Sequence, residues 1–121
     1  MRFMQEFYPS THLLCDFYGC DGLTDVDALR GYLIQAAEKS GATLLSCNMH
    51  GFGANAGVTG VAMLAESHIS IHTWPEMDFA AIDIFMCGAA DPERAADELR
   101  RLMRPKRVEK TAVARGANRI T

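Results

Sequence analysis

The sequence has no long hydrophobic run. Hydrophobic residues make up 49% of its 121 residues, yet no apolar stretch approaches the roughly 20 residues that span a bilayer as a helix. Residues 1–10 also contain no extended apolar segment of the kind found in a secretory signal peptide. We therefore expect a cytoplasmic protein that does not enter a membrane.

Positive charge is also scarce. Twelve Lys and Arg stand against fifteen Asp and Glu, which gives a formal net charge of -3. The basic residues form one cluster at 100–107, which fits a solvated helix end because cations suit the negative pole of the helix dipole. No basic stripe with interleaved aromatic residues is present, so we predict no nucleic-acid partner.

The cysteines do not have the spacing of a redox or metal motif. There are four, at Cys15, Cys20, Cys47 and Cys87. No two of them form a Cys-x-x-Cys pair, and the cytoplasm disfavours disulfides. The default expectation for each is a small buried side chain.

The length of the chain predicts a single domain. A chain of this size buries only about two-thirds of its unfolded surface, so a functional cleft would strain the core and favours a homo-oligomer. No internal repeat or low-complexity segment divides the sequence.

The pattern of apolar and turn residues predicts six strands and two helices. Strands are expected over 11–18, 43–49, 58–64, 68–74, 80–86 and 106–114, with a glycine-rich mobile loop over 51–57. The first helix is expected over 25–40, with Thr24 as N-cap and Gly41 as C-cap, and the second begins at Asp91-Pro92. This order favours an α+β fold, a two-layer α/β sandwich of an antiparallel sheet with two helices on one face.

Alternation along 68–74 and 80–86 separates two faces of the predicted sheet. One face carries Ile69, Ile71, Ile82 and Ile84. The other carries His68, Ser70, His72, Asp83, Phe85 and Cys87. If the two strands pair as a hairpin, the aliphatic face takes the helices. The polar face then meets water, a partner subunit or a substrate.

The most informative segment is residues 65–76, which read Ala-Glu-Ser-His-Ile-Ser-Ile-His-Thr-Trp-Pro-Glu. It places a Glu-Ser bond before a short alternating strand with two histidines, and Cys87 follows the next strand. Serine, histidine and cysteine are the residue types needed to rearrange a backbone bond and then move protons.

This segment resembles the self-cleavage region of the small bacterial and archaeal S-adenosylmethionine decarboxylases. The resemblance extends to residues 79–88 (Phe-Ala-Ala-Ile-Asp-Ile-Phe-Met-Cys-Gly), 57–60 (Gly-Val-Thr-Gly) and 40–43 (Ser-Gly-Ala-Thr), and so covers about residues 11–113. It implies the sandwich fold and a homodimer of cleaved protomers. It also implies that the single domain 1–121 is cleaved into a beta chain, 1–66, and an alpha chain, 67–121.

The resemblance assigns roles in self-cleavage. Ser67 would attack the carbonyl of Glu66, and elimination would leave a pyruvoyl group, derived from Ser67, at the head of residues 67–121. His72 matches the processing histidine, and a neutral imidazole takes a proton near pH 7. Thr59 matches a processing serine, and its extra methyl group predicts slower processing.

The resemblance also assigns roles in catalysis and binding. The pyruvoyl carbonyl would condense with the amine of S-adenosylmethionine and accept the electrons left by carbon dioxide. Cys87 matches the acid that protonates the α-carbon, and Glu76 an acid that binds the ribose hydroxyls. Phe52 matches an aromatic that stacks on adenine and suits a sulfonium cation. The implied product is the aminopropyl donor for spermidine synthesis.

Two departures from the family pattern keep other functions open. The loop 53–57 (Gly-Ala-Asn-Ala-Gly) replaces a shorter, proline-containing one, and Asp16 stands where a glutamate is common. An alternative is therefore a pyruvoyl-dependent ornithine or arginine decarboxylase, with Asp16 or Asp83 binding the distal nitrogen. Another is an uncleaved paralogue that acts as a regulatory subunit.

A metal-binding domain is the last alternative. His68 and His72 point the same way from one strand, and His12 and His50 could join them as ligands. We predict no metal site, because the serine and cysteine segments explain more of the sequence.

Overall fold

The computed structural model describes residues 10–116, in which six strands and two α-helices form a two-layer α+β sandwich. The strands are β1 (Ser10–Tyr18), β2 (Leu44–Gly51), β3 (Val58–Leu64), β4 (Ser67–Trp74), β5 (Phe79–Met86) and β6 (Arg107–Arg115). The helices are α1 (Val26–Ser40) and α2 (Pro92–Met103), and a 3-10 turn, η2, covers Pro75–Met77. Most of the amino-terminal segment in which we expect no signal peptide lies outside the described residues.

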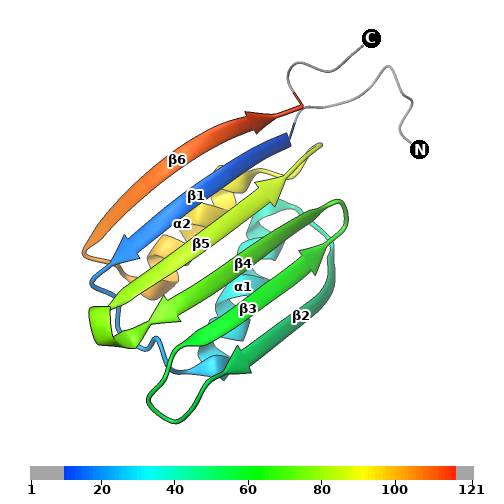
Figure 1. The fold of residues 1–121 in the computed structure, drawn as a ribbon. Coiled ribbons are helices and arrows are strands. Elements are labelled where there is room, and N and C mark those ends of the chain that lie inside the picture. Colours follow the sequence, from blue (N-terminus) through cyan, green and yellow to red (C-terminus); the bar gives the residue numbers. More distant parts are fainter. Residues whose placement is uncertain (1–9, 117–121) are drawn as a thin grey trace.

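The sheet is antiparallel throughout, in the order β2-β3-β4-β5-β1-β6. Figure 1 shows both helices side by side against one face of this sheet, while no described element covers the other face. The predicted fold class, element order and helix placement are confirmed.

The helix ends follow from local side-chain chemistry. The side chain of Asp25 accepts a hydrogen bond from the N–H of Ala28 at 3.0 Å, so Asp25 is the N-cap of α1. The prediction of Thr24 was wrong by one residue, because the extended backbone that precedes the helix is at position 25, from which the Asp25 carboxylate accepts that hydrogen bond. Gly41 ends α1 at a φ of 84°, and the side chain of Asp91 caps α2, both as predicted.

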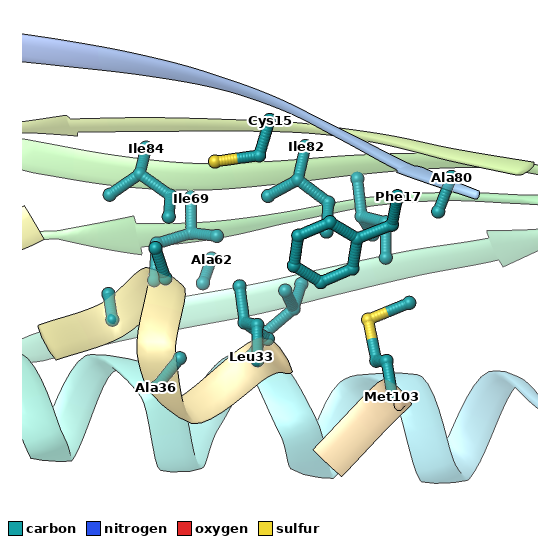
Figure 2. Packing of buried hydrophobic residues seen from close by; sticks show 14 of the residues in the cluster. Cys15, Phe17, Leu33, Ala36, Ala62, Ile69, Ala80, Ile82, Ile84 and Met103 are labelled. Carbon is teal, nitrogen blue, oxygen red and sulfur yellow. The ribbon is translucent and has the colours of Figure 1, made fainter. Parts of the chain in front are cut away.

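The core lies between the sheet and the two helices. Ile69, Ile71, Ile82 and Ile84 are at most 2% exposed, which confirms the aliphatic face predicted from parity. In Figure 2 the labelled side chains of the sheet project toward Leu33 on α1 and toward Met103 on α2. Full burial of one such aliphatic side chain contributes about 1.5–3 kcal/mol.

Strand register arranges the uncovered face in rows across the sheet. Successive rows are His12, Phe85, His68 and Met63; Leu14, Asp83, Ser70 and Val61; Asp16, Ala81, His72 and Thr59; and Tyr18, Phe79 and Trp74. The first row lies near the start of β4 and the last row at its end. The two ends of β4 therefore carry different groups of side chains.

Candidate active site

The Glu66–Ser67 bond lies in the tight turn between β3 and β4. Only Ala65 and Glu66 separate the two strands. Glu66 has a φ of 61°, in the left-handed region that costs a non-glycine residue about 1–2 kcal/mol. The backbone is therefore strained at the residue whose carbonyl precedes Ser67.

A thiol reaches the same carbonyl. The register that pairs His68 with Phe85 places Cys87 opposite Glu66. The Sγ of Cys87 donates to the carbonyl oxygen of Glu66 at 3.2 Å. A donor at this oxygen stabilises negative charge that develops there when a nucleophile attacks the carbonyl. The fold thus brings together three residues predicted from sequence: Glu66, Ser67 and Cys87.

The other predicted residues gather around a cavity at the opposite end of β4. Thr59 on β3 pairs with His72, and its Oγ1 lies 3.2 Å from Nδ1 of the imidazole. The cavity has a volume of about 230 Å³. It is lined by Phe52, Gly57, Val58, Thr59, His72, Thr73, Trp74 and Glu76.

Trp74 is a wall of this cavity that the sequence interpretation did not select. It is the only tryptophan of the chain and is 38% exposed. Its ring stacks on Phe79 at 5.4 Å, Phe79 stacks on Tyr18 at 5.1 Å, and the Arg107 guanidinium lies 4.0 Å from the centre of the Tyr18 ring. A row of stacked rings therefore fixes the orientation of the indole. The sequence signal was present, because position 74 shares a strand face with His72.

The loop beside the cavity is held by Thr73. Its buried hydroxyl accepts from the N–H of Val58 at 2.8 Å and donates to the carbonyl of Leu23 at 2.7 Å. A Cβ at Gly57 would lie 2.1 Å from the carbonyl oxygen of Thr73. Glycine is thus required at 57 for the loop carrying Phe52 to pack against β4.

The two groups of residues do not meet within one chain. His72 follows Ser67 by five residues, which is about 16 Å along a strand at roughly 3.3 Å per residue. An odd separation also places the two side chains on opposite faces, and Ser67 shares the face of Ile69. His72 therefore cannot accept a proton from Ser67 of the same chain.

A family model described as S-adenosylmethionine decarboxylase matches residues 11–116. The chain belongs to this family. It is 44% identical over 108 residues to the S-adenosylmethionine decarboxylase proenzyme of Methanococcus vannielii, covering 87% of this chain and 88% of that protein. The proenzyme of Thermotoga maritima is 43% identical, with 87% and 82% covered.

A solved structure supports the same assignment. The crystal structure of the adenosylmethionine decarboxylase from Aquifex aeolicus superposes with a TM-score of 0.83 at 35% identity, covering 95% of this chain and 98% of that one. The family resemblance identified from residues 65–76 is confirmed.

In this S-adenosylmethionine decarboxylase family member, a polar group also occupies the middle of the uncovered face. Ser70 Oγ donates to Asp83 Oδ2 at 3.3 Å, and the other carboxylate oxygen lies 3.7 Å from Nε2 of His12.

Within residues 10–116, no group of three or more His, Cys, Asp and Glu side chains is arranged to hold a metal ion. No helix in the same span is long and apolar enough to cross a bilayer.

The cysteines of the family member differ in environment. Burial raises the pKa of Cys15 and of Cys20 to about 11, so both remain neutral thiols packed in the core, as expected by default. Cys47 and Cys87 are only partly buried, so the expectation of a small buried side chain was wrong for these two cysteines. Cys87 is thus an accessible thiol at the strained turn.

Proposed function

We propose that this protein is a self-processing decarboxylase that converts S-adenosylmethionine to its decarboxylated aminopropyl donor for spermidine biosynthesis. The observation that carries the proposal is the 3.2 Å contact between the Cys87 thiol and the carbonyl oxygen of Glu66. Family membership and relatives named as proenzymes support it. We also propose a cytoplasmic location, without nucleic-acid or membrane partners.

Self-cleavage uses groups of the chain itself. Ser67 Oγ attacks the carbonyl carbon of Glu66, and the amide bond is exchanged for an ester. A base removes the α-proton of residue 67, the ester bond to its Cβ breaks, and Glu66 leaves as a carboxylate. The dehydroalanine at 67 takes up water and releases ammonia, which leaves a pyruvoyl group on chain 67–121 and frees chain 1–66. The Cys87 thiol stabilises the oxyanion formed in the attack.

A second copy supplies the missing base. His72 lies about 16 Å along β4 from Ser67 of its own chain, and Thr59 lies beside it on β3. A two-fold axis through the uncovered face near the middle of β4 would bring the end of the partner's β4 to the start of the first. The uncovered face, on which Leu14, Val61, Met63 and Trp74 are exposed, is the surface on which such a copy packs. His72 of the partner subunit then accepts the α-proton of residue 67 during processing, and Thr59 of the partner subunit holds that imidazole. This reasoning supports a homodimer of cleaved protomers.

The residues present fit a pyruvoyl group at position 67, because the Cys87 thiol contacts the carbonyl next to it. When formed, that group condenses with the substrate amine and accepts the electrons released with carbon dioxide. Cys87 holds a proton at Sγ and delivers it to the α-carbon. Glu76 of the partner subunit accepts hydrogen bonds from the ribose hydroxyls. Phe52 of the partner subunit, 63% exposed at the cavity, stacks on adenine and faces the sulfonium.

The cavity favours the nucleoside over a basic amino acid. The rings of Phe52 and Trp74 offer faces on which a purine can stack. Ornithine and arginine have no aromatic ring that could stack there. Of the two carboxylates considered for a distal nitrogen, Asp83 already interacts with Ser70 and lies near His12. The amino acid decarboxylase therefore remains the second candidate.

The intact mass of the purified protein under denaturing conditions tests the proposal. We expect two fragments, one ending at Glu66 and one starting at residue 67 that is lighter than a serine-headed peptide by one ammonia. A single full-length mass that persists on warming would contradict self-processing and favour the uncleaved regulatory paralogue.

Substrate choice is tested by the fluorescence of Trp74, the only tryptophan. The Ser67→Ala variant keeps the cavity without turnover. We expect S-adenosylmethionine to change its emission and ornithine or arginine to leave it unaltered. The reverse pattern would support the amino acid decarboxylase.

A further inference from the structure

The contact between Cys87 and Glu66 changes its chemical character when the chain is cleaved. Before cleavage, the thiol donates to a neutral amide carbonyl at 3.2 Å. After cleavage, the same oxygen belongs to the terminal carboxylate of chain 1–66. We propose that this new carboxylate holds Cys87 in its protonated form, so that self-cleavage prepares the acid for the decarboxylation. The inference rests on the proposed function.

The direction of the effect follows from electrostatics. A thiolate beside a carboxylate is a pair of like charges, which disfavours loss of the thiol proton. A protonated thiol instead donates a charge-assisted hydrogen bond to the carboxylate, which is stronger than its bond to the neutral carbonyl. An acid that must donate a proton to the α-carbon needs its S–H form populated at working pH. Cleavage therefore favours the form that catalysis requires.

The fold keeps the new terminus beside the thiol. Only Ala65 and Glu66 extend beyond β3, which remains paired with β2 and β4. The N–H of Ala65 donates to the carbonyl of Thr43 at 2.9 Å, within the same fragment 1–66. The terminal carboxylate is thus tethered to a sheet position opposite Cys87.

No other neighbouring charge is created by cleavage. The titratable groups at nearby register positions are His68 on β4, His12 on β1 and Arg115 on β6, together with the side chain of Glu66. Each is present both before and after cleavage. A change in Cys87 between the two states is therefore caused by groups that cleavage itself makes: the carboxylate and the pyruvoyl group.

The test measures the rate of Cys87 alkylation by iodoacetamide from pH 6 to pH 10, read by peptide mass. Cleaved wild-type protein is compared with the uncleaved Ser67→Ala variant. We expect the pH of half-maximal rate to be higher in the cleaved protein by about one unit, which is an approximately tenfold slower reaction below both midpoints. A change in access alters the plateau rate and leaves the midpoint in place.

Two controls isolate the carboxylate. Cys47 on β2 belongs to the same chain, and its midpoint should be the same in both proteins. Borohydride reduction of the pyruvoyl group in cleaved protein should keep the Cys87 shift, because the carboxylate remains. Equal midpoints, a lower midpoint after cleavage, or loss of the shift on reduction would each overturn the inference. An uncleaved wild-type mass would instead refute the proposed function itself.

Discussion

The separation of Ser67 from His72 predicts complementation between two inactive variants. Ser67→Ala lacks the nucleophile and His72→Ala lacks the base, so neither should be cleaved alone; loss of a positioned base slows a step by about 10²–10⁴-fold. In a mixed dimer of the proposed kind, residue 67 of the His72→Ala chain lies beside the intact His72 of its partner, which can remove its α-proton. That one bond should be cleaved. His72 is exposed, so its replacement by alanine should not prevent folding.

The expected yield follows from random pairing. Equal coexpression gives about half of all chains in mixed dimers, so about half of the His72→Ala chains and none of the Ser67→Ala chains are cleaved. Denaturing mass spectrometry with distinct tags on the two chains measures both fractions. His50→Ala, another exposed histidine of the sheet, is the matched control and should be cleaved by itself. Cleavage of the His72→Ala variant when it is expressed by itself would refute the two-copy site. Absence of any cleaved chain in purified mixed dimers would refute it as well.

Three further predictions concern single positions. Thr59→Ser should be cleaved faster than wild type in a time course of intact mass, because it keeps the hydroxyl beside the imidazole without the methyl group; a slower time course would contradict this. In urea unfolding, Gly57→Ala should lower the free energy of unfolding by about 1–3 kcal/mol, because its Cβ meets the backbone at 2.1 Å. Gly31→Ala, in α1, should raise it by about 0.5–1 kcal/mol, because there is open space around that position. The hydrogen bond from Arg101 lowers the pKa of Glu98, so its stabilisation is present above the ordinary carboxyl range and lost as pH falls through the lowered pKa. The melting temperatures of wild type and Arg101→Gln should therefore converge as the pH falls from 7 to 3. A difference in melting temperature that stays constant would show that the lowered pKa of Glu98 does not contribute to stability.

Local pattern was sufficient to predict the elements and the faces of this fold. Alternation of isoleucine placed β4 and β5 correctly because side-chain period and burial are both local properties of a strand. The sequence interpretation predicted Thr24 instead of Asp25 as the N-cap, because both residue types accept the same hydrogen bond and only backbone geometry decides between them. Parity also implied that Ser67 and His72 lie on opposite faces, although the sequence interpretation did not use it.

The side-chain contacts between neighbouring strands could not be predicted from the sequence. The bond from Cys87 to the carbonyl of Glu66 depends on the register between β4 and β5, which residue type alone does not set. The stacking of Phe79 on Tyr18 likewise joins β5 to β1, which is distant along the chain. Family resemblance supplied roles for individual residues, but not which of them one chain can bring together.

The strand order has a consequence for the protein after the proposed cleavage. Chain 1–66 contributes β1, β2 and β3, and chain 67–121 contributes β4, β5 and β6. Since β1 lies between β5 and β6, and β4 adds to β3, the two fragments are interleaved rather than placed side by side. Unfolding then becomes a dissociation, so its midpoint rises with protein concentration, and refolding becomes a bimolecular search. Cleavage thus makes the refolding of each protomer depend on two fragments finding each other.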